Sequence, residues 1–129
     1  METYFSIRNP ADIADFMEKT NALHDGYIIA VEYQNDGIKS TGDTYEFHSE
    51  LKRLKIRVLI TSMQDAVLEM LFENVSEWRI TEAENDILEA AVAFNDNGSI
   101  LWTDCAKNID TFKKNGSYAI AESMKWRIL

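Results

Sequence analysis

The chain has 129 residues, of which 46% are hydrophobic and 11% aromatic, which excludes wholesale disorder and is enough for one domain with a buried core, residues 1–129. Its 13 Lys+Arg and 22 Asp+Glu leave a net charge of −9, and neither half is basic, which argues against nucleic acid and anionic membranes as partners. Cys105 stands alone, and we find neither a signal-peptide pattern nor a bilayer-length apolar run, so a cytoplasmic location is expected.

The first predicted element is a helix that begins at Asn9-Pro10. Asn9 can cap it, and Pro10 suits the first helical position. The helix should end near Thr20-Asn21. It is short, so packing of its apolar stripe on a sheet must stabilise it. That stripe consists of Ile13, Phe16 and Met17.

A strand follows from residue 27, where the apolar period changes from helical to two. We expect one face to carry Tyr27, Ile29, Val31 and Tyr33. The Asn35-Asp36-Gly37 sequence predicts a hairpin turn, and Gly42-Asp43 is a second turn signal within the irregular segment 38–50.

The next two strands are predicted over 54–61 and 65–80. In the first, four apolar residues alternate with polar ones, which is typical of a half-buried strand: Leu54, Ile56, Val58 and Ile60. Residues 65–73 are also rich in helix formers, but the β-prone residues that follow favour a strand with a bulge or tight turn near Asn74.

The last part of the chain predicts a hairpin over 94–102, turning at Asn95–Gly98, and a final strand over 118–126. Polar loops are expected over 82–86 and 105–116. Since the connections are short and no strand–helix–strand repeat occurs, the fold class is α+β. We expect one N-terminal amphipathic helix packed on a mostly antiparallel sheet of about six to seven strands.

His24-Asp25, just before Gly26, is the nearest approach to a chemical motif. A histidine beside a carboxylate suits acid–base work or metal binding. A metal site needs three or four ligands, however, and the chain has one other histidine, His48. The simpler interpretation is a turn, with Asp25 bonded to backbone amides and Gly26 supplying an unusual backbone angle.

Glu122 and Trp102 complete the candidate binding residues. Glu122 shares a period-two face with Tyr118, Ile120, Met124 and Trp126, so it is either a buried carboxylate or a paired or exposed one at the rim of a groove. Trp102, with Trp78 and Trp126, could line an aromatic pocket or belong to the core. Arg57, Arg79 and Arg127 lie on predicted strands and either bridge carboxylates or bind an anion.

No glycine-rich phosphate loop, CxxC pair, HExxH or nucleophile elbow occurs, so we assign no catalytic residue, metal ligand or cofactor. The segment His24-Asp25-Gly26-Tyr27-Ile28, with the later Phe72–Val75 and tryptophan-containing strands, resembles small bacterial domains that are uncharacterised or of the immunity-protein type. This resemblance implies a protein that inhibits a toxin by binding it and has no catalytic residues.

Three functions therefore remain open. The leading hypothesis is a non-enzymatic protein-binding module, in one version an immunity-like partner of a basic toxin. The alternative is a small-molecule or metal-binding protein or enzyme, with a site near His24, Asp25, Trp102 and Glu122. A homodimer formed through an edge strand or aromatic face is the third.

Overall fold

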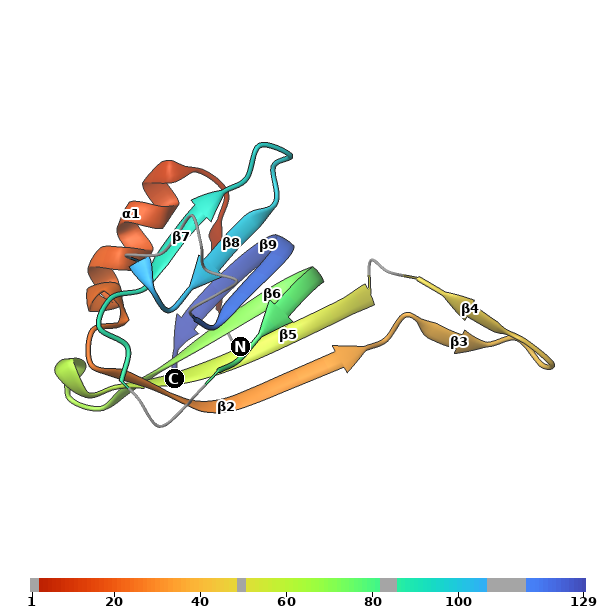
Figure 1. Cartoon of the computed structure of the whole chain (residues 1–129), viewed down its shortest axis with the longest axis horizontal. Coiled ribbons are helices and arrows are strands. Elements are labelled where there is room, and N and C mark those ends of the chain that lie inside the picture. The colour runs from red at the N-terminus through yellow and green to blue at the C-terminus, as the bar shows by residue number, and fades with distance from the viewer. Residues whose placement is uncertain (1–2, 49–50, 82–85, 107–115) are drawn as a thin grey trace.

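The computed structural model describes residues 3–48, 51–81, 86–106 and 116–129 (Figure 1). The elements within these ranges are β1 (Phe5–Ile7), α1 (Pro10–Lys19), β2 (Gly26–Asn35), β3 (Ile38–Ser40), β4 (Tyr45–Phe47), β5 (Lys52–Ile60), β6 (Ala66–Arg79), β7 (Ala91–Phe94), β8 (Ile100–Thr103) and β9 (Tyr118–Ile128), with short 3-10 turns at Asn21–Leu23 and Thr61–Met63. No helix in these ranges is long and apolar enough to cross a membrane.

Seven of the described strands form one antiparallel sheet. Its order is β2-β5-β6-β9-β8-β7, and β1 lies beside β9 in line with β8. The α+β class with a mostly antiparallel sheet is confirmed. Strand β1, which precedes the helix, was not predicted, because its three residues are too few to show a period.

The helix begins and ends where predicted. The Asn9 side chain accepts a hydrogen bond from the backbone N–H of Asp12, and Pro10 is the first helical residue. Phe16 is fully buried, and its ring meets Trp126 of the sheet edge-on, with 5.4 Å between the ring centroids. In Figure 1 the helix lies over the β7, β8 and β9 side of the sheet.

The core lies between the helix and one face of the sheet, the inner face. The predicted alternation of β5 is confirmed, since Leu54, Ile56, Val58 and Ile60 are all fully buried. Residues 66–79 form strand β6 rather than a helix. Asn74 has a left-handed φ of 55°, and the pairing with β9 shifts register between Val75 and Glu77, so the predicted irregularity near Asn74 is also confirmed.

The predicted single apolar face of β2 is wrong. The pairing with β5 shifts register between Ile28 and Ala30, which makes Ile29 an extra, bulged residue. Before the bulge, Tyr27 is opposite Leu59 on the outer face. After it, Val31 and Tyr33 are opposite Ile56 and Leu54 on the inner face. An inserted residue reverses the alternation, and period counting cannot detect it.

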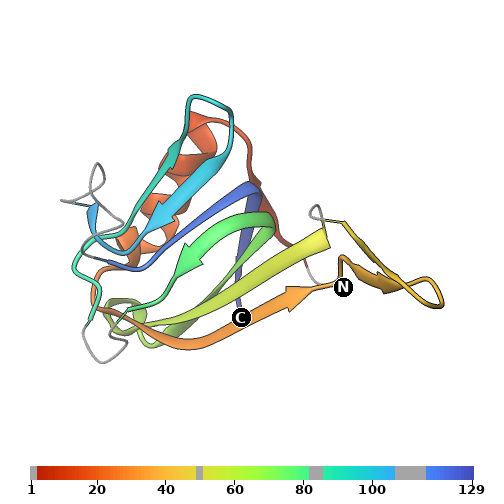
Figure 2. The same ribbon diagram turned by 45° about the vertical axis from the view of Figure 1, so that its right-hand side comes forward.

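The predicted hairpin turn at Asn35-Asp36-Gly37 is also wrong, because β2 pairs with β5 and not with β3. The chain continues through this point into a separate two-stranded sheet of β3 and β4, whose turn is at the predicted Gly42-Asp43. We call residues 37–48 the arm. Figures 1 and 2 show it extending away from the sheet beyond the ends of β2 and β5.

The hairpin over 94–102 is confirmed as β7 and β8. The predicted face of β9 is correct only for Met124 and Trp126, which are in the core. Toward the start of the strand the core residues are Ala119 and Ala121, because the alternation changes phase beside Asn74. The predicted loops over 82–86 and 105–116 lie largely outside the described residues.

Candidate functional site

His24 and Asp25 lie at the end of the sheet where β2 begins. Their side chains form a weak ion pair at 3.6 Å, and both are about half exposed. His24 Nδ1 is 2.8 Å from the backbone oxygen of Leu88. This hydrogen bond, followed by the charge of Asp25, raises the pKa of His24 above its ordinary value of 6.5. These residues form a turn, as the simpler interpretation predicted, but the positive backbone angle lies at Asp25, with φ 58°, and not at Gly26.

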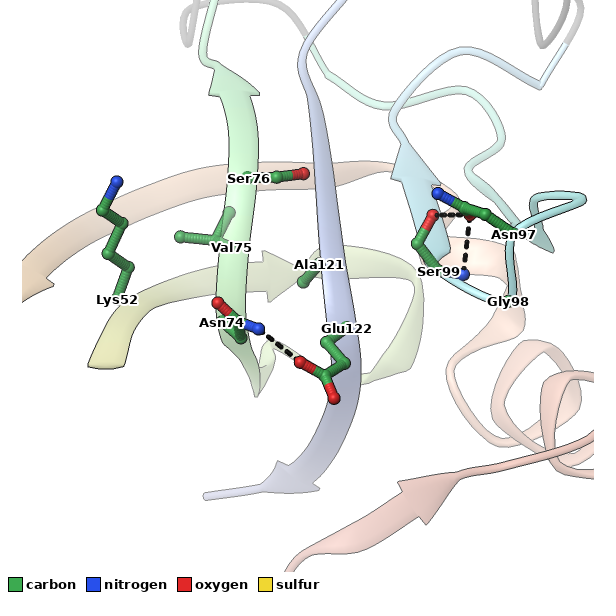
Figure 3. A pocket seen from close by; sticks show the side chains of 9 residues that line it. All are labelled: Lys52, Asn74, Val75, Ser76, Asn97, Gly98, Ser99, Ala121 and Glu122. Atoms are coloured by element: carbon green, nitrogen blue, oxygen red, sulfur yellow. Dashed lines mark hydrogen bonds between the residues drawn. The ribbon is translucent and has the colours of Figure 1, made fainter. Parts of the chain in front are cut away.

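Glu122 is exposed on β9 and accepts a hydrogen bond from the side-chain amide of Asn74 on β6 (Figure 3). It lines an open groove of about 490 Å³. The rim across from Glu122 is the β7–β8 turn, where Asn97 accepts hydrogen bonds from both the backbone and the hydroxyl of Ser99. The complete lining is Lys52, Asn74, Val75, Ser76, Asn97, Gly98, Ser99, Ala121 and Glu122.

The groove offers hydrogen-bonding groups rather than reactive ones. Its described lining includes one carboxylate and one ammonium, with no histidine, cysteine or aromatic ring. Such a lining can bind a small polar molecule, but it lacks a paired acid and base. The choice left open for Glu122 is resolved in favour of an exposed, hydrogen-bonded carboxylate at the rim of a groove.

Trp102 lies in the core and is fully buried, so it lines no accessible pocket. Its indole Nε1 has no hydrogen-bond partner among the described residues. Trp126 is also buried, while Trp78 is partly exposed and its ring lies 5.6 Å from that of Tyr33. The three tryptophans therefore do not form one aromatic pocket.

The structure does not bring the four candidate residues together. Gly26 is opposite Ile60 and Ile60 is opposite Ala66, so His24 and Asp25 lie near the start of β6. Glu122 bonds to Asn74, eight residues along the same strand, and this length of strand spans roughly 26 Å. A single site that includes His24, Asp25 and Glu122 is therefore not present in the described structure.

A buried carboxylate that sequence reasoning missed lies on the outer face, opposite the helix. Glu69 is fully buried and receives hydrogen bonds from the Tyr4 hydroxyl at 2.6 Å, Arg127 Nε at 2.6 Å and Arg57 Nε at 3.0 Å. Lys55 approaches to 3.9 Å. We call these five residues the Glu69 cluster. Arg57 and Arg127 thus bridge a carboxylate, one of the two roles considered for them.

The Glu69 cluster is suited to holding strands together, not to proton transfer. Burial alone would raise the pKa of Glu69, but the hydrogen bonds from Tyr4, Arg127 and Arg57 outweigh it and lower the pKa to about 2. A general base with so low a pKa is ionised but weakly basic near neutral pH. The cluster joins β5, β6, β9 and the segment before β1.

The arm carries a second feature that sequence reasoning missed. Residues directly opposite in an antiparallel pair share a face, and the register is Ile38 with Phe47, Lys39 with Glu46 and Ser40 with Tyr45. One face of the arm is therefore apolar and the other charged. Tyr45 is 65% exposed and Phe47 75%, so nothing among the described residues covers the apolar face.

Exposed apolar residues continue from the arm along β2. They are Tyr27, Ile29, Val31 and Tyr33. The strand lies at the end of the sheet, and its pairing partner in the sheet is β5 alone. Exposed apolar side chains thus occur both on the arm and along β2 at one edge of the molecule, with Tyr27 on the outer face of the sheet and Val31 and Tyr33 on the inner face. The arm could have been recognised in the sequence as a short hairpin, because apolar and charged residues alternate on both sides of Gly42. The apolar ones are Ile38, Tyr45 and Phe47, and the charged ones are Lys39 and Glu46.

No group of three or more potential metal-ligating side chains occurs among the described residues. The comparisons add no relative, since no protein-family model, curated protein or solved structure matches the chain.

Proposed function

We propose that the chain is a non-enzymatic protein-binding module and that the arm and the exposed edge of β2 are its binding surface. The observation that carries this proposal is the uncovered apolar face of the arm. Isolated apolar side chains are common on protein surfaces, but a contiguous set at the end of a projecting hairpin is typical of an interaction site.

The low stability expected of an isolated arm supports the same function. A two-stranded hairpin with no packing partner is only marginally stable in water. At the base of the arm, Asp36 and Arg53 form an ion pair 2.7 Å apart, and the two strands of the arm approach each other closely where Gly37 meets His48. A β-carbon at Gly37 would lie 1.9 Å from the His48 carbonyl oxygen. A partner packed on Ile38, Tyr45 and Phe47 would supply the missing apolar contacts.

The immunity-like version of this proposal adds a basic partner. The net charge of −9 would then increase the rate of association through electrostatic steering, and high salt would slow it. The apolar contacts of the arm would determine the lifetime of the complex instead, since they are not screened by salt. Association and dissociation rates measured at two salt concentrations separate the two contributions.

A small-molecule-binding function is the second candidate, and the groove at Glu122 favours it. Its supporting observation is a cavity of about 490 Å³ with hydrogen-bonding groups from β6, β9 and the β7–β8 turn. A ligand there would be small and polar. Because the groove is distant from His24 and Asp25, this candidate does not include a metal or an acid–base pair at those residues.

The test of the leading proposal is site-specific photo-crosslinking in the cells that make the protein. A photoreactive phenylalanine analogue replaces Phe47, and the same analogue at the exposed helix residue Glu18 is the matched control. We expect a discrete crosslinked protein species from position 47 that is missing from position 18. Equal, diffuse crosslinking from the two positions would contradict a binding function for the arm.

A further inference from the structure

We propose that the occupant of the arm and the β2 edge is a second copy of this chain, with β2 paired antiparallel to its own copy about Tyr33. This inference rests on the proposed protein-binding function and names its partner. Three observations support it: the state of the β2 edge, the position of the arm relative to that edge, and the apolar area that the arm and the edge expose.

The free edge of β2 is regular only in its second half. At its start, Gly26 forms a bridge with Ile87, which covers that end of the strand. The bulge at Ile29 then disrupts the spacing of the backbone groups. From Ala30 to Asn35 the pairing with β5 is continuous, so the opposite edge presents evenly alternating N–H and C=O groups. A backbone partner is therefore expected along these six residues.

Charge selects the register of a symmetric pair along this stretch. Antiparallel pairing centred on Glu32 would place two carboxylates directly opposite each other, which is unfavourable. Centring on Tyr33 places the two tyrosines opposite each other and Glu32 opposite Gln34 of the second copy. Tyr33 lies on the inner face beside Trp78, so the two tyrosines at the centre of the dimer would each be held in place by a tryptophan of their own copy.

The same symmetry brings the arm onto exposed apolar residues of the second copy. Figures 1 and 2 show the arm continuing past the end of β2 in the direction of the strand. With Tyr33 at the centre, Ile38 is level with residue 28 of the second copy. The arm then lies along residues 27–29, where Tyr27 and Ile29 are exposed. Each copy would thus cover the apolar edge of the other.

The exposed apolar area is compatible with a dimer. At about 200 Å² per aromatic side chain, Tyr45 and Phe47 of two copies expose roughly 560 Å², about half of the ~1,200 Å² at the lower end of stable interfaces. Ile38 and the β2 residues would supply the remainder. Residues 26–53 hold five acidic and three basic side chains, a net charge of −2 per copy, and the apolar contacts of the dimer would have to outweigh the resulting repulsion.

The decisive experiment replaces the single native cysteine and introduces one new cysteine at the proposed interface. In a Cys105→Ser background, Tyr33→Cys places one thiol at the proposed two-fold axis. Opposite residues of an antiparallel pair have α-carbons about 4.5–5.5 Å apart, within the range that a disulfide bridges. Under mild oxidation we expect a covalent dimer in about tenfold greater yield than from the control Glu18→Cys on the exposed helix surface.

Sedimentation of the unmodified chain provides an independent readout. We expect a concentration-dependent dimer, and Phe47→Ser should raise its dissociation constant at least about tenfold, as for a hot-spot aromatic residue. Circular dichroism checks that the Tyr33→Cys and Phe47→Ser variants retain the fold.

The outcomes separate this inference from the function on which it rests. A chain that stays monomeric, with Tyr33→Cys crosslinking no better than Glu18→Cys, overturns the dimer; photo-crosslinking at Phe47 to a different protein would leave the binding function intact. A dimer that is unaffected by Phe47→Ser and does not crosslink at residue 33 overturns this interface. Crosslinking at residue 33 together with dissociation by Phe47→Ser supports it.

Discussion

Apolar side chains are buried on the inner face of the sheet and exposed on the arm. On the inner face of β5 and β6, each large apolar side chain from Leu54 to Ile60 and from Leu68 to Phe72 is completely buried. On the arm, the equivalent face carries Ile38, Tyr45 and Phe47, and each is 49–75% exposed. Both regions have the same alternating pattern of apolar and polar residues, yet only the sheet has a helix and further strands to cover its apolar face.

The two regions also differ in how they satisfy charge. The outer face of the sheet buries Glu69 among four donor groups, so its polar groups are completed within the chain. On the charged face of the arm, the side chains of Glu46 and His48 approach each other to 3.5 Å; Glu46 is exposed and His48 is partly exposed. The buried charge of the sheet is thus paired within the chain, while the apolar and charged side chains of the arm are exposed.

The largest expected effect comes from truncating one phenylalanine in each region. Phe72→Ala removes a fully buried ring and should lower the free energy of unfolding by about 3–5 kcal/mol. Phe47→Ala, measured at a dilution where the chain is monomeric, should change it by no more than about 0.5 kcal/mol. Urea unfolding of both variants measures the difference.

Repeating this measurement at higher protein concentration sharpens the comparison. If a second copy covers the arm, the cost of Phe47→Ala should increase with protein concentration, because association stabilises the folded state by mass action. A large, concentration-independent cost for Phe47→Ala would show that the arm is part of the monomer's core and would contradict the distinction between the two regions.

A smaller effect is expected at the Glu69 cluster. Glu69→Ala leaves Arg127, whose side chain is 11% exposed, without its carboxylate, and should cost about 3 kcal/mol. The matched control is Glu73→Ala on the same strand, where Glu73 pairs with Lys125 near the surface at 3.4 Å. That exposed pair contributes about 0–1 kcal/mol. Equal losses in the two variants would mean that burial of Glu69 has no energetic role.

The same carboxylate predicts how stability depends on acid pH. The pKa of Glu69 falls from 4.5 to about 2 on folding. Its contribution is therefore complete above about pH 4.5 and is lost as the pH falls toward 2. The difference in unfolding free energy between the wild type and Glu69→Gln should shrink over this interval. A constant difference would contradict the low pKa.

Much of the sheet could be predicted because its strands follow a simple alternation. Leu54 to Ile60 alternate without interruption, and the hairpin at Asn95–Gly98 has residues that favour a tight turn. The prediction failed at Ile29 and near Asn74, where one backbone irregularity reverses the side-chain phase. Such irregularities depend on the partner strand, so local sequence does not reveal them.

The candidate site was harder to predict because burial and partners depend on the neighbouring strands. Glu122 and Glu69 both follow period-two patterns, but Glu122 lies beside an open groove and Glu69 between two arginines from adjacent strands. The Asp36-Gly37 turn signal obscured the arm, because it suggested a hairpin closing on β2. In fact Gly37 allows close backbone approach to His48 at the base of a longer hairpin.

The smallest predicted effect lies at His24, at the end of β2 remote from the arm. Its raised pKa comes first from the Leu88 carbonyl and then from Asp25, so protonated His24 stabilises the fold. This contribution is present below pH 6.5 and is lost as the pH rises through the higher folded pKa. NMR titration should place the His24 midpoint above 6.5, and Asp25→Asn should lower it. A midpoint at or below 6.5 would mean that these contacts of His24 do not persist in solution, and this end of the sheet would then be closed by the backbone hydrogen bonds between Gly26, Asp25 and Ile87 without help from the His24 side chain.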